Sequence, residues 1–129
     1  VLAGIGKLIR ENSRTYDIAG RFGGEEFSIV LPETEAAAAI GFAERIRQVI
    51  AEAEFEVDTS PVPIHVTMSL GIACFPSDAD TVSDLISVAD VAVYQAKAQG
   101  RNRVAYAWGE TWVGEEADLS SAVNAQPAQ

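Results

Sequence analysis

Hydrophobic residues recur along this chain with the period of a helix in some segments and the period of a strand in others. The first apolar residues share one face of a helix that ends at the polar residues 11–13: Val1, Leu2, Ile5, Leu8 and Ile9. A strand over about residues 17–22 follows, and a second strand over 27–31 returns before Pro32 ends it. The spacing therefore predicts a helix followed by a β-hairpin.

A long second helix is predicted after Thr34, which is a suitable N-cap residue. Its apolar residues recur at helical spacing and are expected to face the core: Ala39, Phe42, Ala43, Ile46, Val49, Ile50 and Ala53. The polar residues between them are Glu44, Arg45, Arg47 and Gln48, and we expect these to face solvent.

The second half of the chain combines strands with one more helix. Residues 64–72 alternate with period two and predict a strand with one buried face, while residues 54–58 predict a weaker edge strand. The sequence from Thr81 resembles a capping box that opens a third helix, and Gly100 is placed to end it. Residues 101–106 are then expected to form a short strand.

This order of elements predicts an α+β fold in which helices pack on an antiparallel sheet. From residue 108 on, the composition turns to Gly, Glu, Ala, Ser and Gln without a sustained period. We therefore expect one domain over residues 1–107 and an acidic, polar tail over residues 108–129. A chain of 129 residues, 48% of them hydrophobic, is long enough for one core.

The charge balance limits the partners of this chain. Nine Lys and Arg residues stand against 19 Asp and Glu residues, which gives a formal net charge of −10. This charge repels nucleic acid and anionic lipid, so neither is expected as a partner. The single cysteine, Cys74, excludes a disulfide framework and favours a reducing, cytoplasmic compartment. No run approaches the ~18 apolar residues of a membrane span, and a membrane anchor elsewhere in a longer parent protein is left open.

The connection between the first two strands carries the strongest chemical signal. It reads Arg-Phe-Gly-Gly-Glu-Glu-Phe from Arg21 to Phe27. Gly23 and Gly24 both tolerate φ > 0, as a two-residue type I′ turn requires, and without a Cβ they allow a ligand to contact the backbone. Acidic residues beside such a turn also serve solubility alone. The whole string resembles the signature of GGDEF domains, the bacterial diguanylate cyclases.

The resemblance extends from Val1 to about Tyr106 and implies a ferredoxin-like fold, similar to the palms of nucleotide cyclases and polymerases. In that family the domain begins with a strand that bears a metal-binding Asp, followed by residues that recognise guanine, and this sequence has neither. The resemblance therefore implies an N-terminally truncated domain that is inactive by itself. It also implies that the missing strand is central in the sheet, so that its absence leaves an open edge.

The resemblance implies that two GTP molecules, one on each of two facing domains, are condensed into cyclic di-GMP and pyrophosphate. Turnover then requires a homodimer. Mg²⁺, with Mn²⁺ as an alternative, suits this displacement because it lowers the pKa of the attacking hydroxyl and neutralises phosphate charge. Glu25 is the expected catalytic residue and metal ligand, since Mg²⁺ prefers oxygen ligands. Glu26 is expected to support the metal or the attacking group, with a structural ion pair as the alternative.

Substrate phosphates need cations, and this acidic chain places two of them at the end of the third helix. Lys97 and Arg101 lie four positions apart in a segment that resembles the family's Lys-x-x-Gly-Arg-Asn stretch. The resemblance implies that both side chains contact the triphosphate, beside the backbone of Gly23 and Gly24. The alternative is that the two cations only interact favourably with the helix dipole.

Arg14 and Asp17 form an Arg-x-x-Asp pair with five residues between Asp17 and Gly23, the spacing of the family's product-inhibition site. Arg14 can contact a guanine edge or a phosphate through two nitrogens, and Asp17 can accept from guanine nitrogens. Arg45 aligns with the second arginine that the family contributes from the following helix. We therefore expect an inhibitory site for cyclic di-GMP, although an exposed helix cation is the alternative for Arg45.

Two alternatives from other functional classes stay open. One is a non-catalytic receptor that binds cyclic di-GMP through Arg14, Asp17 and Arg45, and the other is a scaffold or dimerisation module without a ligand. The intact acids Glu25 and Glu26 favour the enzyme. A parent protein without the first metal-binding Asp would favour the receptor.

Overall fold

The computed structural model of the protein describes residues 1–15, 17–21, 26–107 and 111–112. Three helices and five short strands follow one another in these residues. Their order is α1 (Leu2–Glu11), β1 (Ile18–Arg21), β2 (Phe27–Val30), α2 (Ala36–Glu52), β3 (Leu70–Ile72), α3 (Val82–Ala98), β4 (Val104–Tyr106) and β5 (Thr111–Trp112).

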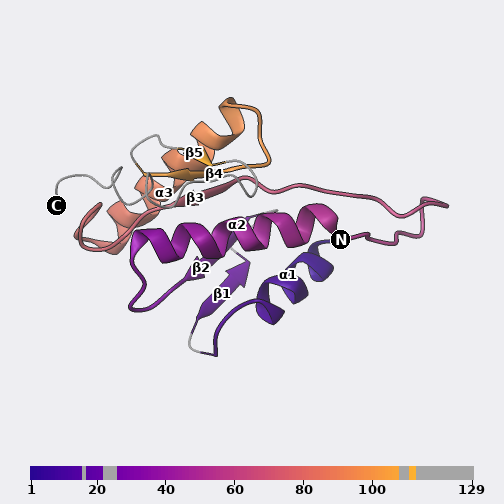
Figure 1. Ribbon diagram of the computed structural model, residues 1–129, viewed down its shortest axis with the longest axis horizontal. Helices are drawn as coiled ribbons and strands as arrows, with labels where there is room; N and C mark the ends of the chain where they lie inside the picture. Colours follow the sequence, from indigo (N-terminus) through magenta and orange to yellow (C-terminus); the bar gives the residue numbers. More distant parts are fainter. Residues whose placement is uncertain (16, 22–25, 108–110, 113–129) are drawn as a thin grey trace.

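Helix α2 runs through the middle of the molecule (Figure 1). Helix α1 and the β1–β2 hairpin lie on one side of it, while β3, β4 and α3 lie on the other. Strands β1 and β2 pair antiparallel, β3 and β4 pair parallel, and β4 and β5 pair antiparallel. Because both α2 and α3 contact β3 and β4, this small sheet is covered by a helix on each face.

The core consists of apolar side chains from both helical layers. One cluster joins α1 to α2 and to the segment that follows α2: Ile5, Ile9, Ile46, Ile50 and Phe55. Strand β4 is buried on both faces, since Tyr106 packs with Ile40 of α2 and Ala105 packs with Ala92 of α3. The short strand expected over residues 101–106 is therefore present as β4, and both of its faces are buried and apolar.

The two predicted ends of the third helix are confirmed. Thr81 is the N-cap of α3, and its hydroxyl accepts from the backbone N–H of Asp84 at 3.1 Å. At the other end, Gly100 has a φ of +125°. The N–H of Arg101 donates to the carbonyl of Ala96 at 2.9 Å, which is the bond of a Schellman motif that follows a glycine of this kind.

Two predictions about α2 are wrong. The helix begins at Ala36 with Glu35 as its N-cap, so Thr34 is not the cap residue. Glu44 and Arg47, which were expected to face solvent, are only 8% and 5% exposed. The physical reason is that the two side chains form an ion pair with each other at 2.8 Å, and a paired charge can be buried where a single charge cannot.

The predicted strand over residues 64–72 is shorter in the structure. Only Leu70–Ile72 belongs to a ladder, and the predicted edge strand over 54–58 is reduced to one bridge between Phe55 and Ile64. Residues 65–69 pair with no strand among the described residues. The alternating apolar side chains still pack against the core, because burial of one face needs no hydrogen-bonded neighbour: Ile64, Val66, Met68 and Leu70.

The last strand lies beyond the predicted domain boundary at residue 107. Thr111 pairs with Ala105, and Trp112 pairs with Val104, so these two residues extend the sheet into the segment that the sequence assigned to the tail. No helix among the described residues is long and apolar enough to cross a membrane.

Candidate functional site

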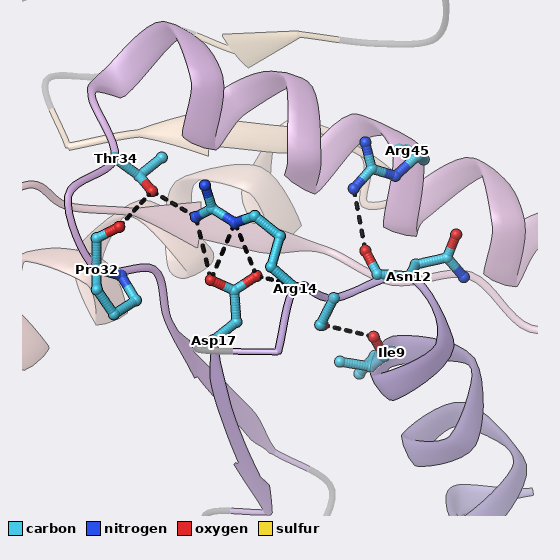
Figure 2. A network of polar contacts seen from close by, with 8 residues as sticks. Ile9, Asn12, Arg14, Asp17, Pro32, Thr34 and Arg45 are labelled. Carbon is cyan, nitrogen blue, oxygen red and sulfur yellow. Dashed lines mark hydrogen bonds and ion pairs between the residues drawn. The ribbon is translucent and has the colours of Figure 1, made fainter.

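The loop between α1 and β1 brings Arg14 and Asp17 into direct contact (Figure 2). The N–H of Asp17 donates to the carbonyl of Arg14 at 3.0 Å, and the N–H of Arg14 donates to Asp17 Oδ2 at 2.8 Å. The Arg14 guanidinium also donates to the carboxylate, through Nε at 3.2 Å and through Nη2 at 3.1 Å. The Asp17 side chain has no exposed surface, whereas the Arg14 side chain is 44% exposed. The loop therefore fixes a carboxylate and presents a guanidinium.

The C-terminal end of α1 positions this loop. Asn12 is the C-cap residue, and its side-chain Nδ2 donates to the carbonyl of Leu8 at 2.8 Å. The hydroxyl of Ser13 donates to the carbonyl of Ile9 at 2.6 Å. Both bonds add a side-chain donor to carbonyls of the last turn, which share the backbone N–H of Asn12 at 3.2 Å. The polar residues that end the helix thus also set the direction in which the chain leaves it.

Two side chains from the α2 region complete the cluster (Figure 2). The Arg14 Nη2 atom donates to the Thr34 hydroxyl at 2.6 Å, and Thr34 donates in turn to the carbonyl of Pro32 at 2.9 Å. Arg45 extends from α2 and donates through Nη2 to the carbonyl of Asn12 at 3.0 Å. The structure therefore brings both predicted arginines together at this loop: Arg14 belongs to the loop, and Arg45 reaches it from α2.

The electrostatics of the cluster favour an ionised Asp17. The hydrogen bonds from the Arg14 side chain lower the pKa of the Asp17 carboxyl below its usual value, although burial of the carboxyl acts in the opposite direction. Arg45 lies over the ring of Phe42, with 5.3 Å between its guanidinium carbon and the ring centroid. A carboxylate acceptor beside two guanidinium donors matches a ligand edge that offers both donors and acceptors, such as guanine.

The glycine hairpin is described only in part. Gly23, Gly24 and Glu25 lie outside the described residues. Glu26 is exposed and directly precedes β2. The register pairs Arg21 with Phe27, whereas a two-residue turn at the two glycines would pair Arg21 with Glu26. The register thus differs by one residue from the predicted one, because residues 22–26 together connect the two strands.

Lys97 and Arg101 lie at the C-terminal end of α3, and both side chains are exposed. Lys97 is in the last turn of the helix. Arg101 follows Gly100 and has a φ of +63°, in the left-handed region that a residue with a side chain rarely adopts. Both cations therefore lie at the same end of α3, Lys97 within its last turn and Arg101 in the turn that follows. This geometry can present two positive charges to an anion.

Among the described residues, no group of three or more His, Cys, Asp and Glu side chains could hold a metal ion. Cys74 is half-buried. Burial raises the pKa of its thiol, as does the nearby Asp78 carboxylate. The hydroxyl of Tyr106 donates to the same carboxylate at 3.3 Å, and burial raises the pKa of Tyr106 as well. Neither side chain is a ready nucleophile near neutral pH.

Sequence reasoning missed three polar residues that hold the two predicted sites in place. Thr34 contacts Arg14, and the carbonyl of Asn12 contacts Arg45. Asn102 accepts from Arg47 across 55 positions of sequence. The one available signal was the polar run at the end of the first helix, because the contacts from Thr34 and Asn102 depend on how α2 is packed.

Comparisons with known proteins identify the family of this chain. The family described as "Diguanylate cyclase, GGDEF domain" matches residues 1–103. Diguanylate cyclase A of Treponema denticola is 39% identical over 104 residues, which are 81% of this chain and 28% of that protein. The chain thus spans little more than a quarter of the length of this relative.

Two solved structures are also similar. The active GGEEF domain of a diguanylate cyclase from Vibrio cholerae superposes with a TM-score of 0.71 at 33% identity, over 81% of this chain and 65% of that one. The GGDEF domain of DgcB from Caulobacter crescentus, in complex with c-di-GMP, has a TM-score of 0.70 at 27% identity, over 80% of this chain and 60% of that one.

The fold and the polar loop define an α+β domain of the nucleotide-cyclase type, with helices packed on a small, mainly antiparallel set of strands. The predicted fold class is confirmed. The chain belongs to the GGDEF family of diguanylate cyclase domains.

Proposed function

We propose that the protein containing this chain condenses two GTP molecules into cyclic di-GMP and is inhibited by that product at the loop between α1 and β1. Family membership supports the reaction class. The observation that supports the inhibitory site is the contact of Arg14 with the buried Asp17, together with Arg45 at the same loop. A related GGDEF domain from Caulobacter crescentus has been solved in complex with c-di-GMP.

The inhibitory site would work through an oriented acceptor between two donors. Asp17 is ionised at neutral pH, but its side chain has no exposed surface while it is paired with Arg14, so it would accept from the N–H groups of a guanine base once the Arg14 guanidinium turns from it to the ligand. The exposed part of the Arg14 guanidinium and the Arg45 guanidinium can donate to phosphate or to base oxygens. The backbone N–H groups of Arg14 and Asp17 are each engaged in a hydrogen bond within this pair, so the backbone of these two residues loses little conformational entropy on binding.

The catalytic half of the proposal assigns roles to four other residues. Lys97 and Arg101 bind the triphosphate of GTP from the end of α3, and both are accessible to it. Glu25 would hold Mg²⁺, or Mn²⁺ in its place, because a carboxylate is a hard oxygen donor of the type that Mg²⁺ prefers. Glu26, which is exposed and directly precedes β2, would support the metal or the attacking group. When bound, the metal neutralises phosphate charge and lowers the pKa of the attacking hydroxyl.

Cyclic di-GMP contains two guanosine units joined by two phosphodiester linkages. Each linkage forms between the hydroxyl of one GTP molecule and the activated phosphate of the other. We therefore propose that turnover needs two facing copies of the domain, each with one GTP. The cytoplasm, which contains GTP and Mg²⁺, is the proposed compartment. The prediction that the 129 residues alone are inactive is tested by assaying them beside the full-length protein.

The test uses the full-length protein with GTP and Mg²⁺, and it measures cyclic di-GMP by chromatography. Glu25→Gln removes the charge of the proposed metal ligand but keeps the size of the side chain, so we expect product formation to fall by at least about 100-fold. Glu56→Gln is the matched control, because it makes the same chemical change at an exposed glutamate in the segment after α2. Equal rates for Glu25→Gln and the wild-type protein would refute the catalytic assignment.

A receptor without catalytic activity is the second candidate, because the cyclic dinucleotide site is the one whose predicted side chains the structure brings together. It predicts that the full-length protein binds cyclic di-GMP and forms none from GTP. Product formation by the wild-type protein that depends on Glu25 would exclude it.

A further inference from the structure

The turn after α3 has an unusual backbone. Gly100, Arg101 and Asn102 have consecutive positive φ angles of 125°, 63° and 49°. Glycine adopts such angles at no steric cost and asparagine tolerates them, but arginine does not favour them. A non-glycine residue in this region persists only where the surrounding structure holds it, and such positions are common where a ligand is clamped.

A buried ion pair on α2 holds this turn from one side. Arg47 Nη1 donates to the side-chain Oδ1 of Asn102 at 2.8 Å. The same guanidinium donates to both carboxylate oxygens of Glu44, through Nε at 2.8 Å and through Nη2 at 3.1 Å. The carboxylate therefore fixes the plane of the guanidinium, and the remaining nitrogen points at Asn102.

The turn is also held by its own side chains. Arg103 Nε donates to the carbonyl of Arg101 at 3.0 Å. A Cβ added at Gly100 would lie 2.7 Å from Arg103 Nη2, so the arginine folds back over the glycine. Arg101 is thus fixed at its N–H by Ala96, at its carbonyl by Arg103, and through the next residue by Arg47. Its side chain remains exposed.

Stability alone is a poor explanation for the buried pair. Removing two charges from water costs about as much as their attraction returns, and apolar residues of similar size are often at least as stable in such positions. The pair instead orients the donor for Asn102, because apolar residues at positions 44 and 47 would leave Asn102 without a hydrogen-bond partner on α2. This argues for a positional role at the neighbouring cations.

We propose that Arg47, oriented by Glu44, is a positioning residue: it fixes Asn102 and thereby the left-handed turn that presents Arg101, beside Lys97, to the phosphates of a nucleoside triphosphate. This inference rests on the proposed function, since it takes Arg101 as a phosphate contact. It adds a residue pair on α2 that does not touch the substrate and acts through the turn.

The test measures binding by the full-length protein of a GTP analogue whose α,β-bridging oxygen is replaced by methylene, with Mg²⁺, by calorimetry. Asn102→Gly keeps a backbone that accepts a φ of 49° and removes the side chain that accepts from Arg47. Arg47→Lys keeps the charge and removes the planar fork. For both variants we expect Kd to rise about 5- to 20-fold, which is the loss of roughly one well-placed charged contact.

Two further measurements separate positioning from folding. With GTP as substrate, KM should rise in the same proportion while kcat stays within about two-fold, because the chemistry at the metal is unchanged. The midpoint of thermal unfolding should fall much less for Asn102→Gly than for an unpaired buried charge such as that left by Glu44→Gln. Glu52→Gln, an exposed change at the end of α2, is the control and should alter neither value.

Each outcome decides the matter. A wild-type Kd for both Asn102→Gly and Arg47→Lys would overturn the inference, whatever happens to the unfolding temperature. Two variants that fail to fold would assign the network to folding alone and would also overturn it. If the wild-type protein itself does not bind the analogue, the proposed function fails first, and the wild-type titration distinguishes that case.

Discussion

Replacing Arg14 by Ala is expected to weaken binding of cyclic di-GMP to this chain. Arg14 donates to both oxygens of the buried Asp17 carboxylate and to Thr34, so its removal does two things at once. It deletes a guanidinium that can contact the ligand, and it removes the donors that orient the acceptor. Both losses act in the same direction.

The size of the effect follows from the exposure of the side chain. A hydrogen bond to a charged group contributes about 1.5–3 kcal/mol when it is protected from water. Arg14 is 44% exposed, so solvent and salt screen part of that interaction, and about 1–2 kcal/mol is a better expectation. This corresponds to a Kd that is about 5- to 30-fold higher. The Kd of Arg14→Lys should lie between those of the wild-type protein and Arg14→Ala, because lysine keeps the charge but cannot donate through two nitrogens at once.

Calorimetric titration of the chain with cyclic di-GMP measures this change directly. Arg10→Ala is the matched control, since Arg10 is an exposed arginine in the last turn of α1 that contributes the same charge. Its Kd should remain within about two-fold of the wild-type value, because the effect of one exposed charge without direct contact to the ligand is weakened by solvent and salt. If Arg14→Ala and Arg10→Ala weaken binding equally, net charge explains the effect and the site does not exist.

Three further predictions concern stability and use urea unfolding. Gly71→Ala places a Cβ against the backbone of α3 and should lower the free energy of unfolding by at least about 1–3 kcal/mol. Gly41→Ala adds a Cβ in open space within a helix and should raise it by about 0.5–1 kcal/mol. Equal effects of the two changes would refute the clash at Gly71. Arg14 lowers the pKa of Asp17 in the folded state, so the ionised Asp17 stabilises the fold fully above its unfolded-state pKa of 3.8. This contribution to the free energy of unfolding is lost as the pH falls through the pKa of the folded state. Asp17→Asn should remove that part of the pH dependence. Thr81→Ala should cost about 1 kcal/mol, and a neutral result would contradict its role as the cap.

The sequence was a good guide wherever a structure depends on neighbours along the chain. The face of α1 and the two ends of α3 follow from residues within one or two turns, and these predictions are confirmed. The family was also identified from a local string of residues, which the comparisons confirm. The spacing of Arg14 and Asp17 is local as well, and the structure places the two side chains in contact.

Errors arose where a distant segment decides the outcome. Thr34 satisfies the rules for an N-cap, but it contacts Arg14, and the helix begins two residues later. Residues 64–72 have the period of a strand, yet only the last three belong to a ladder, because a ladder needs a neighbour that periodicity does not specify. Arg45 reaches the loop after α1 through a contact 33 positions apart in sequence.

The sequence by itself determined the family, the fold class and the types of side chain that are available for chemistry. Only the tertiary structure decided which of those side chains meet, and the clearest case is α2. Helical periodicity assigns Glu44 and Arg47 to the solvent face because each is charged. They are buried because each neutralises the other and Asn102 accepts the remaining donor. The free energy of a buried charge depends on its partners, and one of these partners is distant in sequence.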